Sequence, residues 1–352
     1  MLLSRVRLLH LGPFEDLTLS LEDDAGAPRR MVVLFGGDGV GKTSVLAAIA
    51  STRPGHAVAQ FRTRGEEGPT PCVIADWMLG ADDPARLHPL RVASPNTKLD
   101  EPEDAATFRR REQSLFDKRA TERGFTLVAF TGARWFSRAA VVLTTPERSV
   151  LRYDVRAPAS FDDAMRGDLT RETKQVLSFA PIAAALARRG GAPHEQATRL
   201  EAIDQALRGV LAALLDGTGT SYLGIDPLRL EPVFEIGGGR RVDFDDLGRS
   251  ARHLVAFGAL TLRALAAAHP GGDPREAEGV VLLDDLELQQ PAHRQRSLAA
   301  RLRLALPRAQ WIVTTSSPAV TLGCELSDVI ALRREPSSGR VELHAGPDAV
   351  LH

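Results

Sequence analysis

The chain has 352 residues, of which 43% are hydrophobic and 25% are charged, and its formal net charge is −1 at pH 7. A chain of this length can bury a large core as one domain or two lobes. The balanced charge excludes a general affinity for nucleic acid or for an anionic membrane, so any such preference would need a local patch.

The two cysteines, Cys72 and Cys324, lie far apart in the sequence and form no metal-ligand pattern. Domains that depend on disulfides carry more cysteines, so we predict reduced thiols in an intracellular protein. The first residues lack the apolar core of a signal peptide. No apolar run approaches the roughly 20 residues that a membrane-spanning helix needs. We therefore expect a soluble, cytoplasmic protein with no membrane partner.

The N-terminal elements follow from hydrophobic periodicity. Residues 2–21 alternate apolar and polar in two short runs around Gly12-Pro13, which predicts a β-hairpin. The continuous apolar run 31–35 predicts a buried central strand that enters a glycine-rich loop. Residues 43–51 then predict a helix.

The rest of the chain alternates between the two periodicities. The middle predicts strands at 58–62, 72–77, 127–130 and 139–143, a long loop at 82–104, and helices at 107–123, about 162–189 and 194–215. The last third predicts helices at 250–268 and 294–306, buried strands at 280–283 and 311–315, and closing strands at 329–332 and 341–344. No internal repeat or low-complexity tract is present.

The glycine-rich loop carries the clearest motif. Gly36-Gly37-Asp38-Gly39-Val40-Gly41-Lys42-Thr43 has the spacing G-x-x-x-x-G-K-T between a predicted strand and a predicted helix. Its backbone N–H groups and the helix N-terminus would hold phosphates, with Ser44 in the same binding set. Lys42 would neutralise the β- and γ-phosphates, and Thr43 would bind Mg²⁺. We expect Asp38 to point outward, since its charge would repel phosphate. The alternative, a turn that binds nothing, is disfavoured by the flanking elements. We predict binding of ATP with Mg²⁺.

A second acidic segment follows the apolar run 280–283, which leads directly into Asp284 and Asp285. Four apolar residues followed by acids fit the Walker B pattern. Asp284 would then hold Mg²⁺, and Asp285 would orient the attacking water. The alternative is an ordinary strand that ends in a solvated acidic turn, but a phosphate-binding loop upstream favours the catalytic interpretation.

With these motifs the chain resembles the ABC-type ATPases of the RecF, SMC and overcoming-lysogenisation-defect group. The resemblance rests on the opening hairpin around 11–15, on the acidic segment 282–287, and on the segment 307–318, which is similar to the family's P-x-x-Q-x-I-x-T-T-H-S-P strand. It implies an α/β P-loop NTPase fold of ABC type, with a mixed central sheet, an N-terminal antiparallel β-subdomain and an inserted helical lobe. The ATPase lobe would comprise 1–60 and 236–352, and the insertion 61–235.

Several positions depart from the family pattern. Asp285 stands where the family has its catalytic Glu, and Ser316 stands where a His senses the γ-phosphate. The family's Leu-Ser-x-Gly turn caps the γ-phosphate of the partner subunit. Here Gly248 stands where Ser is usual and Ser250 where Gly is usual, so Ser250 would either donate to phosphate or serve only as a helix cap. Since Lys42 and the Mg²⁺ ligands remain, we predict ATP binding with slow hydrolysis.

Partners follow from the resemblance alone. It implies a homodimer with ATP sandwiched in the interface, acting as a switch in genome maintenance or in defence against phage and plasmids. The alternatives are a nearly inactive regulatory subunit bound to an effector protein and a RecF-like repair ATPase. For the latter, basic side chains could contact DNA, although a solvated helix face is the interpretation we favour. The basic candidates are Arg109, Arg110, Arg111, Lys118, Arg119, Arg134 and Arg138.

Overall fold

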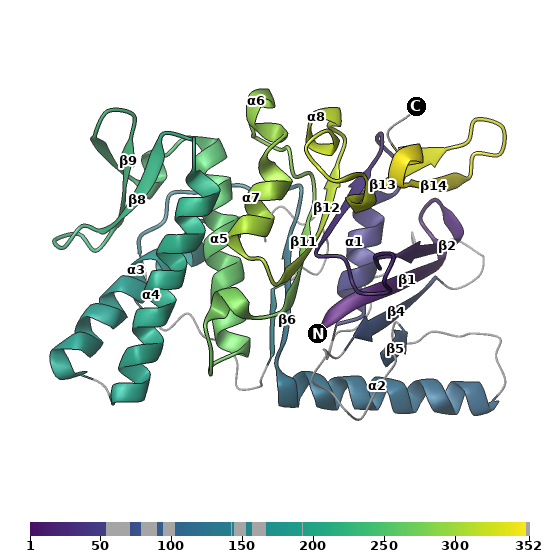
Figure 1. Cartoon of the computed structure of the whole chain (residues 1–352), viewed down its shortest axis with the longest axis horizontal. Helices are drawn as coiled ribbons and strands as arrows, with labels where there is room; N and C mark the ends of the chain where they lie inside the picture. Colours follow the sequence, from purple (N-terminus) through teal and green to yellow (C-terminus); the bar gives the residue numbers. More distant parts are fainter. Residues whose placement is uncertain are drawn as a thin grey trace.

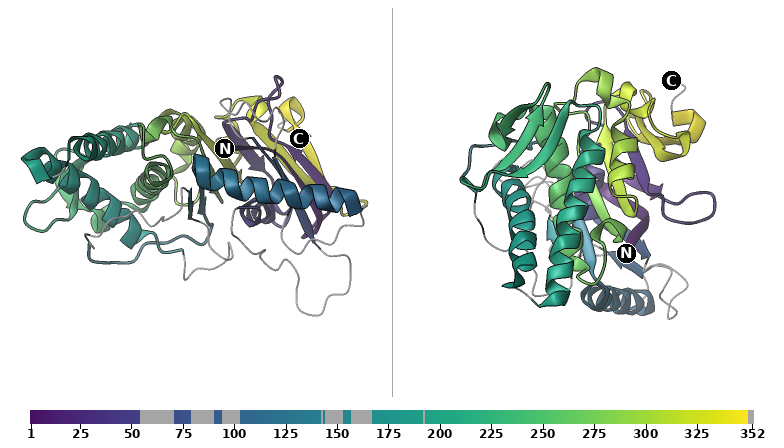
Figure 2. Two further views of the ribbon diagram at one scale, coloured as in Figure 1. Left: turned by 90° about the horizontal axis from the view of Figure 1, so that it is seen from below. Right: turned by 60° about the vertical axis from the view of Figure 1, so that its left-hand side comes forward.

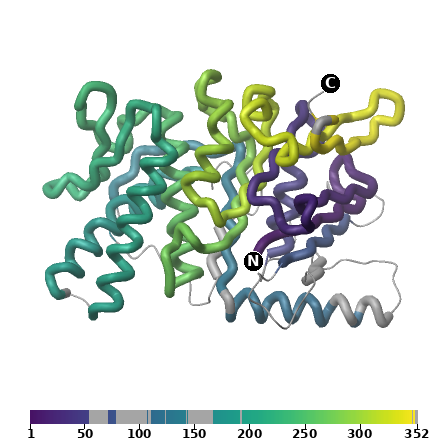
Figure 3. Tube along the Cα trace, in the orientation of Figure 1, coloured from purple at the N-terminus to yellow at the C-terminus, as the bar shows by residue number. Residues whose placement is uncertain are grey.

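The computed structural model describes residues 1–53, 71–78, 90–93, 103–141, 143, 153–156, 167–191 and 193–349. Its layers are visible in Figure 1, where the central strands stand between a group of helices and an antiparallel sheet. Figure 3 shows that the N-terminal segment (purple) and the C-terminal segment (yellow) occupy the same half of the molecule. The chain therefore has the α/β class that the sequence predicts.

The central sheet has seven strands within the described ranges, and its middle strands are buried. Their order is β14 (Val341–Ala345), β13 (Val329–Arg334), β3 (Met31–Phe35), β12 (Ala309–Thr315), β11 (Gly279–Leu283), β6 (Phe125–Phe130) and β7 (Tyr153–Arg156). Neighbours pair in parallel except β14, which is antiparallel to β13. The continuous apolar runs suit burial on both faces. The predicted mixed sheet is thus confirmed.

An antiparallel sheet covers one side of this arrangement. Its order is β2 (Phe14–Ser20), β1 (Leu2–Leu11), β4 (Cys72–Met78) and β5 (Leu90–Ala93). Helix α1 (Lys42–Ser51) shares a core with this sheet and with β3 through Val45, Leu46 and Ile49. Helix α2 (Glu103–Arg123) adds Phe116, whose ring stacks 5.6 Å from that of Trp77. The predicted hairpin and N-terminal β-subdomain are confirmed.

Helices cover the other face of the central sheet, as both views in Figure 2 show. They are α3 (Thr170–Leu186), α4 (His194–Leu215), α5 (Arg249–Ala268) and α7 (Leu298–Ala305). Helix α5 is buried along most of its length because it packs between α3, α4 and the β6 side of the sheet. A small antiparallel sheet of β8 (Thr220–Ile225), β9 (Pro232–Ile236) and β10 (Arg240–Asp243) adjoins this layer.

The structure corrects the predicted strand after residue 139 and the predicted helix start over residues 167–169, whereas residues 162–166 lie outside the described residues. No strand forms over 139–141, because the Ala139 carbonyl accepts a hydrogen bond from Lys174 instead of from a neighbouring strand. Helix α3 begins at Thr170 because the Asp168 carboxylate accepts hydrogen bonds from the backbone N–H groups of Thr170 and Ser137. Both errors arise from side-chain contacts over long sequence separations, which periodicity does not record.

Other boundaries also differ. The predicted helix 294–306 is two helices, α6 (Ala292–Gln295) and α7, and the predicted loop 82–104 contains β5 and the start of α2. Strands β7 to β10 were not predicted, because each is only four to six residues long. The predicted strand 58–62 lies outside the described residues. None of the described helices is long and apolar enough to cross a membrane.

The sheet pairing refines the two-lobe division. Strands β4 and β5 pair in the N-terminal sheet, and β6 and β7 pair in the central sheet, although all four fall within the predicted insertion 61–235. These strands are therefore part of the body that carries the glycine-rich loop. We propose that the inserted lobe is the later part, from α3 to β10.

Candidate nucleotide-binding site

The glycine-rich loop joins β3 to α1 and packs against the turn of the N-terminal hairpin. Gly41 has a φ of 94°, and a Cβ there would lie 2.6 Å from Phe14 Cζ and 2.7 Å from Pro13 Cγ. A Cβ on Gly36 would lie 2.6 Å from the Leu332 carbonyl oxygen. Only glycine therefore fits these two motif positions without movement of the surroundings. Asp38, between them, is exposed, as the outward orientation requires.

Lys42 and Ser44 point in different directions from the start of α1. The Lys42 side chain is buried, and its Nζ donates to the carbonyl oxygens of Gly36 and Gly37, each at 2.8 Å. Its charge is thus held inside the curve of the loop, where phosphate oxygens would be bound. Ser44 lies against the hairpin turn, since a Cβ on Gly12 would be 3.4 Å from Ser44 Oγ.

The parallel strands β3 and β11, on either side of β12, bring the predicted magnesium ligands to the same edge of the sheet. The Thr43 hydroxyl lies 3.0 and 2.9 Å from the two oxygens of the Asp284 carboxylate. The Thr314 hydroxyl, at the end of β12, donates to Asp284 Oδ1 at 2.7 Å and fixes the carboxylate from the other side. A hydroxyl and one carboxylate, with phosphate oxygens, form a ligand set that Mg²⁺ prefers, so the residues fit this ion. In the described part of the chain, no group of three or more His, Cys, Asp or Glu side chains could hold a metal.

Asp285 adopts a backbone conformation that was not predicted. Its φ is 48°, in the left-handed region where Asp and Asn are enriched among non-glycine residues. Its N–H donates to the Thr314 hydroxyl at 2.8 Å, and its carbonyl accepts from Arg134 Nη2 at 2.6 Å. Burial, together with the negative charges of Asp284 and Glu287, raises the pKa of Asp285, and Arg134 and Lys42 oppose this. The carboxylate therefore lies beside the magnesium ligand pair with its backbone fixed.

Arg134 is buried against the end of the acidic strand, which rules it out as an exposed DNA contact. Its guanidinium donates to the carbonyl oxygens of Thr131, Asp284 and Asp285 and lies over the ring of Phe257, 5.3 Å from the centroid. Burial lowers the pKa of Arg134 to about 10, so it remains protonated at neutral pH. The donors of Arg134 are directed at main-chain oxygens, so the alternative in which Arg134 contacts DNA is wrong for this arrangement.

Of the basic side chains of α2 that the structure describes, three are exposed and Arg119 is half-buried. Arg110 and Arg111 are exposed, and Lys118 and Arg119 pair with Glu122 at 3.7 and 3.3 Å. Pairs of this kind are typical of a solvated helix surface. Helix α2 therefore agrees with the solvated helix face that the sequence analysis favoured over a DNA contact.

Ser316 lies at the exposed end of β12 and is bonded to an acid that the sequence left without a role. Its N–H and its hydroxyl both donate to Glu287 Oε1 at 2.8 Å, and the Thr315 hydroxyl donates to Glu287 Oε2 at 2.6 Å. Burial would raise the pKa of Glu287, but these hydrogen bonds outweigh it and lower the pKa, so the carboxylate is ionised at neutral pH. The segment that would sense the γ-phosphate is thus anchored by Glu287.

Gly248 and Ser250 lie at the start of α5. Gly248 is the exposed N-cap residue, and the Ser250 hydroxyl donates to Gln290 Oε1 at 2.7 Å. The alternative that Ser250 is the helix cap is therefore wrong, because its side chain bonds to Gln290 and not to the first turn. The Gln290 side chain thus connects Ser250 directly to the segment after Asp285.

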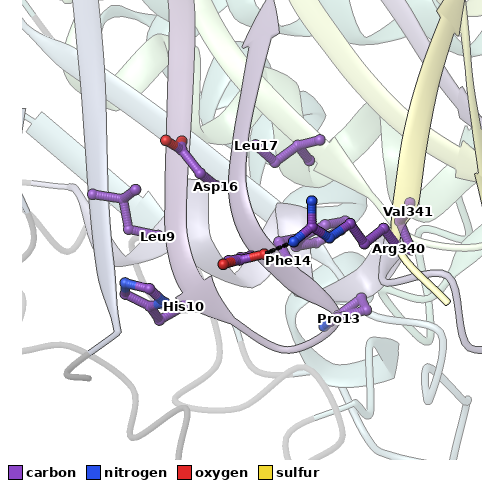
Figure 4. Close-up of a pocket in the computed structure, with 9 residues that line it drawn as sticks. Leu9, His10, Pro13, Phe14, Asp16, Leu17, Arg340 and Val341 are labelled. Atoms are coloured by element: carbon purple, nitrogen blue, oxygen red, sulfur yellow. Dashed lines mark ion pairs between the residues drawn. The ribbon is translucent and has the colours of Figure 1, made fainter. Parts of the chain in front are cut away.

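A cavity of about 480 Å³ borders the hairpin turn that supports the loop (Figure 4). It is lined by the hairpin and by the start of β14, and the Glu15 carboxylate pairs there with Arg340 at 2.9 Å. Both of these side chains are largely exposed. Because Pro13 and Phe14 contact the loop at Gly41, one wall of the cavity belongs to the support of the predicted phosphate site.

Sequence reasoning missed Thr314, Gly132 and the role of Arg134. The sequence could have indicated Thr314, because it carries a hydroxyl at the carboxyl end of a predicted buried strand beside the acidic strand. Gly132 and Arg134 had none, because they reach the site from the end of β6, which no motif marks. A Cβ on Gly132 would lie 2.8 Å from Asp285 Oδ2 and 3.2 Å from Asp284 Oδ2.

The strand order, the loop between β3 and α1, and the acid pair after β11 define a P-loop NTPase fold of ABC type. Among solved structures, the chain is similar to SMC head domains. The SMC head bound to the C-winged helix domain of ScpA shares 12% identity, with a TM-score of 0.56, covering 99% of each chain. The SMC head from Thermotoga maritima shares 13% identity, with a TM-score of 0.47, covering 98% of this chain and 99% of that one.

A third SMC head, with an extended coiled coil and bound to the C-terminal domain of ScpA from Pyrococcus furiosus, shares 11% identity, with a TM-score of 0.49, covering 98% of this chain and 96% of that one. No protein-family model and no curated protein sequence matches the chain. The likeness establishes the fold of an SMC head, as the sequence resemblance predicted.

Proposed function

We propose that the protein is an ATP-binding ABC-type ATPase that hydrolyses ATP slowly and acts as a nucleotide-dependent switch. The observation that carries the proposal is the convergence of Thr43 and Asp284 at 2.9–3.0 Å beside a loop that encloses the Lys42 ammonium. Loop N–H groups, a lysine and a hydroxyl–carboxylate pair are the groups that hold a nucleoside triphosphate with its metal. Bound Mg²⁺ would neutralise phosphate charge between Thr43 and Asp284.

Each residue of the proposed site has a separate role in ATP binding or hydrolysis. Lys42 binds the phosphates, and Asp285 orients the water that attacks the γ-phosphorus and accepts its proton as the bond to the bridging oxygen breaks. Ser316 contacts the γ-phosphate. Asp285 is one methylene shorter than Glu, and its backbone is fixed by Thr314 and Arg134, so it cannot move closer to the water. A misplacement of about 1 Å costs on the order of a hundredfold in rate, which supports slow turnover.

Binding is tested by titration with ATP and Mg²⁺. Lys42→Ala removes a charged donor to phosphate, so we expect its ATP affinity to fall at least tenfold, in keeping with about 1.5–3 kcal/mol for a charge-assisted hydrogen bond. Lys118→Ala on the exposed face of α2 is the matched control and should bind as the wild type does. Equal affinity in Lys42→Ala and the wild type would contradict the assignment.

Turnover and assembly test the switch. Ordinary enzymes turn over at about 10 s⁻¹, and we expect the purified chain to remain below about 1 s⁻¹. We also propose that ATP joins two copies, with Gly248 and Ser250 of one copy facing the nucleotide of the other, which mass measurement with and without ATP would detect. A turnover typical of fast ATPases would exclude the slow switch. Association only with a different protein would favour the regulatory subunit instead.

A further inference from the structure

A tight turn, residues 285–290, follows the acidic strand and contacts the start of α5 through Gln290. Its backbone is closed by hydrogen bonds from Leu288 N to the Asp285 carbonyl at 3.0 Å and from Gln290 N to the Glu287 carbonyl at 2.9 Å. Positive φ angles at Asp285 and Gln289 shape its two ends. Leu286 anchors the turn in the core, where it is 1% exposed. The turn is therefore a rigid connection and not a loose loop.

One end of the 285–290 turn holds the segment that faces the γ-phosphate. Glu287 receives hydrogen bonds from the Thr315 hydroxyl and from both the N–H and the hydroxyl of Ser316, all between 2.6 and 2.8 Å. With three donors on one carboxylate, a displacement of Ser316 would pull directly on Glu287. The position of this end of the turn therefore depends on the position of residues 315–316.

The other end holds the start of α5. Gln290 is buried, its Oε1 accepts from the Ser250 hydroxyl at 2.7 Å, and its Nε2 lies 3.3 Å from the Ser250 carbonyl oxygen. A second branch returns to β12, since Gln295 Nε2 donates to the Gln290 carbonyl at 3.0 Å and Ser317 Oγ donates to Gln295 Oε1 at 2.5 Å. Hydrogen bonds thus close a circuit through residues 287, 290, 295 and 315–317, and Ser250 is attached to this circuit at Gln290.

We propose that Gln290 is a positioning residue that holds Ser250 in register with residues 315–317 of its own subunit. The inference rests on the proposed function. When nucleotide moves Ser316, the 285–290 turn transmits the movement through Gln290 to Ser250, at the end of α5 that faces the second subunit. Each subunit's signature turn is then placed according to the nucleotide in that same subunit, which makes dimer closure depend on ATP at both sites.

A purely space-filling role for Gln290 predicts a different outcome from the same substitutions. Methionine has a similar length and volume but cannot bond to Ser250, whereas glutamate keeps the acceptor for the short bond from the Ser250 hydroxyl and loses only the longer bond to the Ser250 carbonyl oxygen. If Gln290 only fills space, Gln290→Met should preserve activity. If Gln290 acts through Ser250, Gln290→Met should lose activity and Gln290→Glu should recover most of it. The pair therefore separates positioning from packing.

The experiment measures ATP affinity, ATP-dependent self-association and kcat in four variants of the full chain: Gln290→Met, Gln290→Glu, Ser250→Ala and the double variant Gln290→Met with Ser250→Ala. We expect Gln290→Met to keep ATP affinity within twofold while association and kcat fall at least tenfold. Gln290→Glu should stay within threefold of the wild type. Ser250→Ala should match Gln290→Met, and the double variant should add less than twofold, because both changes break the same connection.

Gln113→Met is the matched control, since Gln113 makes a single side-chain bond on α2 to Asp117 and should behave as the wild type. Normal association and kcat in Gln290→Met, or multiplied losses in the double variant, would overturn the inference. If Gln290→Met fails to fold, Gln290→Glu and Ser250→Ala test the inference, because only Ser250→Ala removes the 2.7 Å bond between Ser250 and Gln290. Equal association and kcat in these two variants would then overturn it. If the wild type did not bind ATP and did not differ from Lys42→Ala, the proposed function would instead be refuted.

Discussion

A single added methyl group at Gly132 is expected to slow hydrolysis while leaving ATP bound. Gly132 follows β6 and faces both acids of the site. An alanine Cβ there would lie 2.8 Å from Asp285 Oδ2, whereas ordinary contact begins near 3.4 Å, so the oxygen must move by the difference, 0.6 Å. For Asp284 Oδ2 the distance is 3.2 Å and the required shift is only 0.2 Å.

The displacement falls on the Asp285 side chain because its backbone cannot follow. The Asp285 N–H is bonded to Thr314, and its carbonyl is bonded to Arg134. If a 1 Å misplacement costs about a hundredfold, a shift of 0.6 Å costs on the order of tenfold in kcat. The small shift at Asp284 leaves the magnesium ligand pair nearly intact, so the ATP dissociation constant should change less than about threefold.

The assay is phosphate release at saturating ATP and Mg²⁺, with a binding titration on the same samples. Gly272→Ala is the control, because a Cβ there meets nothing within 4 Å and the residue lies in the turn before β11, outside the site. Thermal unfolding confirms that both variants are folded. Unchanged turnover in Gly132→Ala, or a loss of binding as large as the loss of turnover, would refute the placement of Asp285 as the water-orienting acid.

Three further predictions use other contacts. Asp285→Asn keeps a residue that tolerates the left-handed backbone but removes the base, so turnover should fall at least tenfold with ATP affinity retained, and equal turnover would exclude Asp285. Lys174→Met leaves Glu231 and Asp245 without the buried ammonium that lies 2.8 and 3.0 Å from them, so urea denaturation should show a loss of about 3 kcal/mol. Burial lowers the pKa of His253 from 6.5 to about 4. The contribution of the neutral His253 side chain to the free energy of unfolding is therefore fully present above pH 6.5 and is lost as the pH falls toward 4. The wild type should therefore lose about 3 kcal/mol more than His253→Gln between pH 7 and pH 4, and an equal loss in both would contradict the burial argument.

The parts of the fold that could be predicted are those coded by local pattern. The loop from Gly36 to Thr43 combines a motif with a continuous apolar strand before it and a periodic helix after it. In the structure the strand keeps its predicted bounds and the helix begins one residue earlier. Strands β11 and β12 were placed for the same reason. Parallel pairing then brings Thr314 beside Asp284, a contact that follows from adjacency in the sheet.

The parts that could not be predicted depend on contacts between distant segments. Arg134 was considered as a DNA contact because it is one of several basic residues between 109 and 138. Its burial results from β6 inserting beside β11, which a sequence of mixed periodicity does not reveal. The start of α3 was misplaced because Asp168 is fixed by Ser137, on a segment that helical periodicity does not include.

The conformation of Asp285 changes the meaning of its substitution for Glu. From the sequence alone, the residue is a glutamate that has lost a methylene. In the structure it is the left-handed residue at which the chain leaves β11, and its carbonyl is directed at the buried Arg134. Asp is better tolerated there than a longer side chain, because its short carboxylate can bond locally. Lengthening the side chain alone would therefore not restore fast hydrolysis, since Gly132 and the fixed backbone also determine where the carboxylate lies. We infer that slow turnover is a property of the whole turn, whereas the Thr43–Asp284–Thr314 contacts, where we propose that the metal is held, do not depend on it.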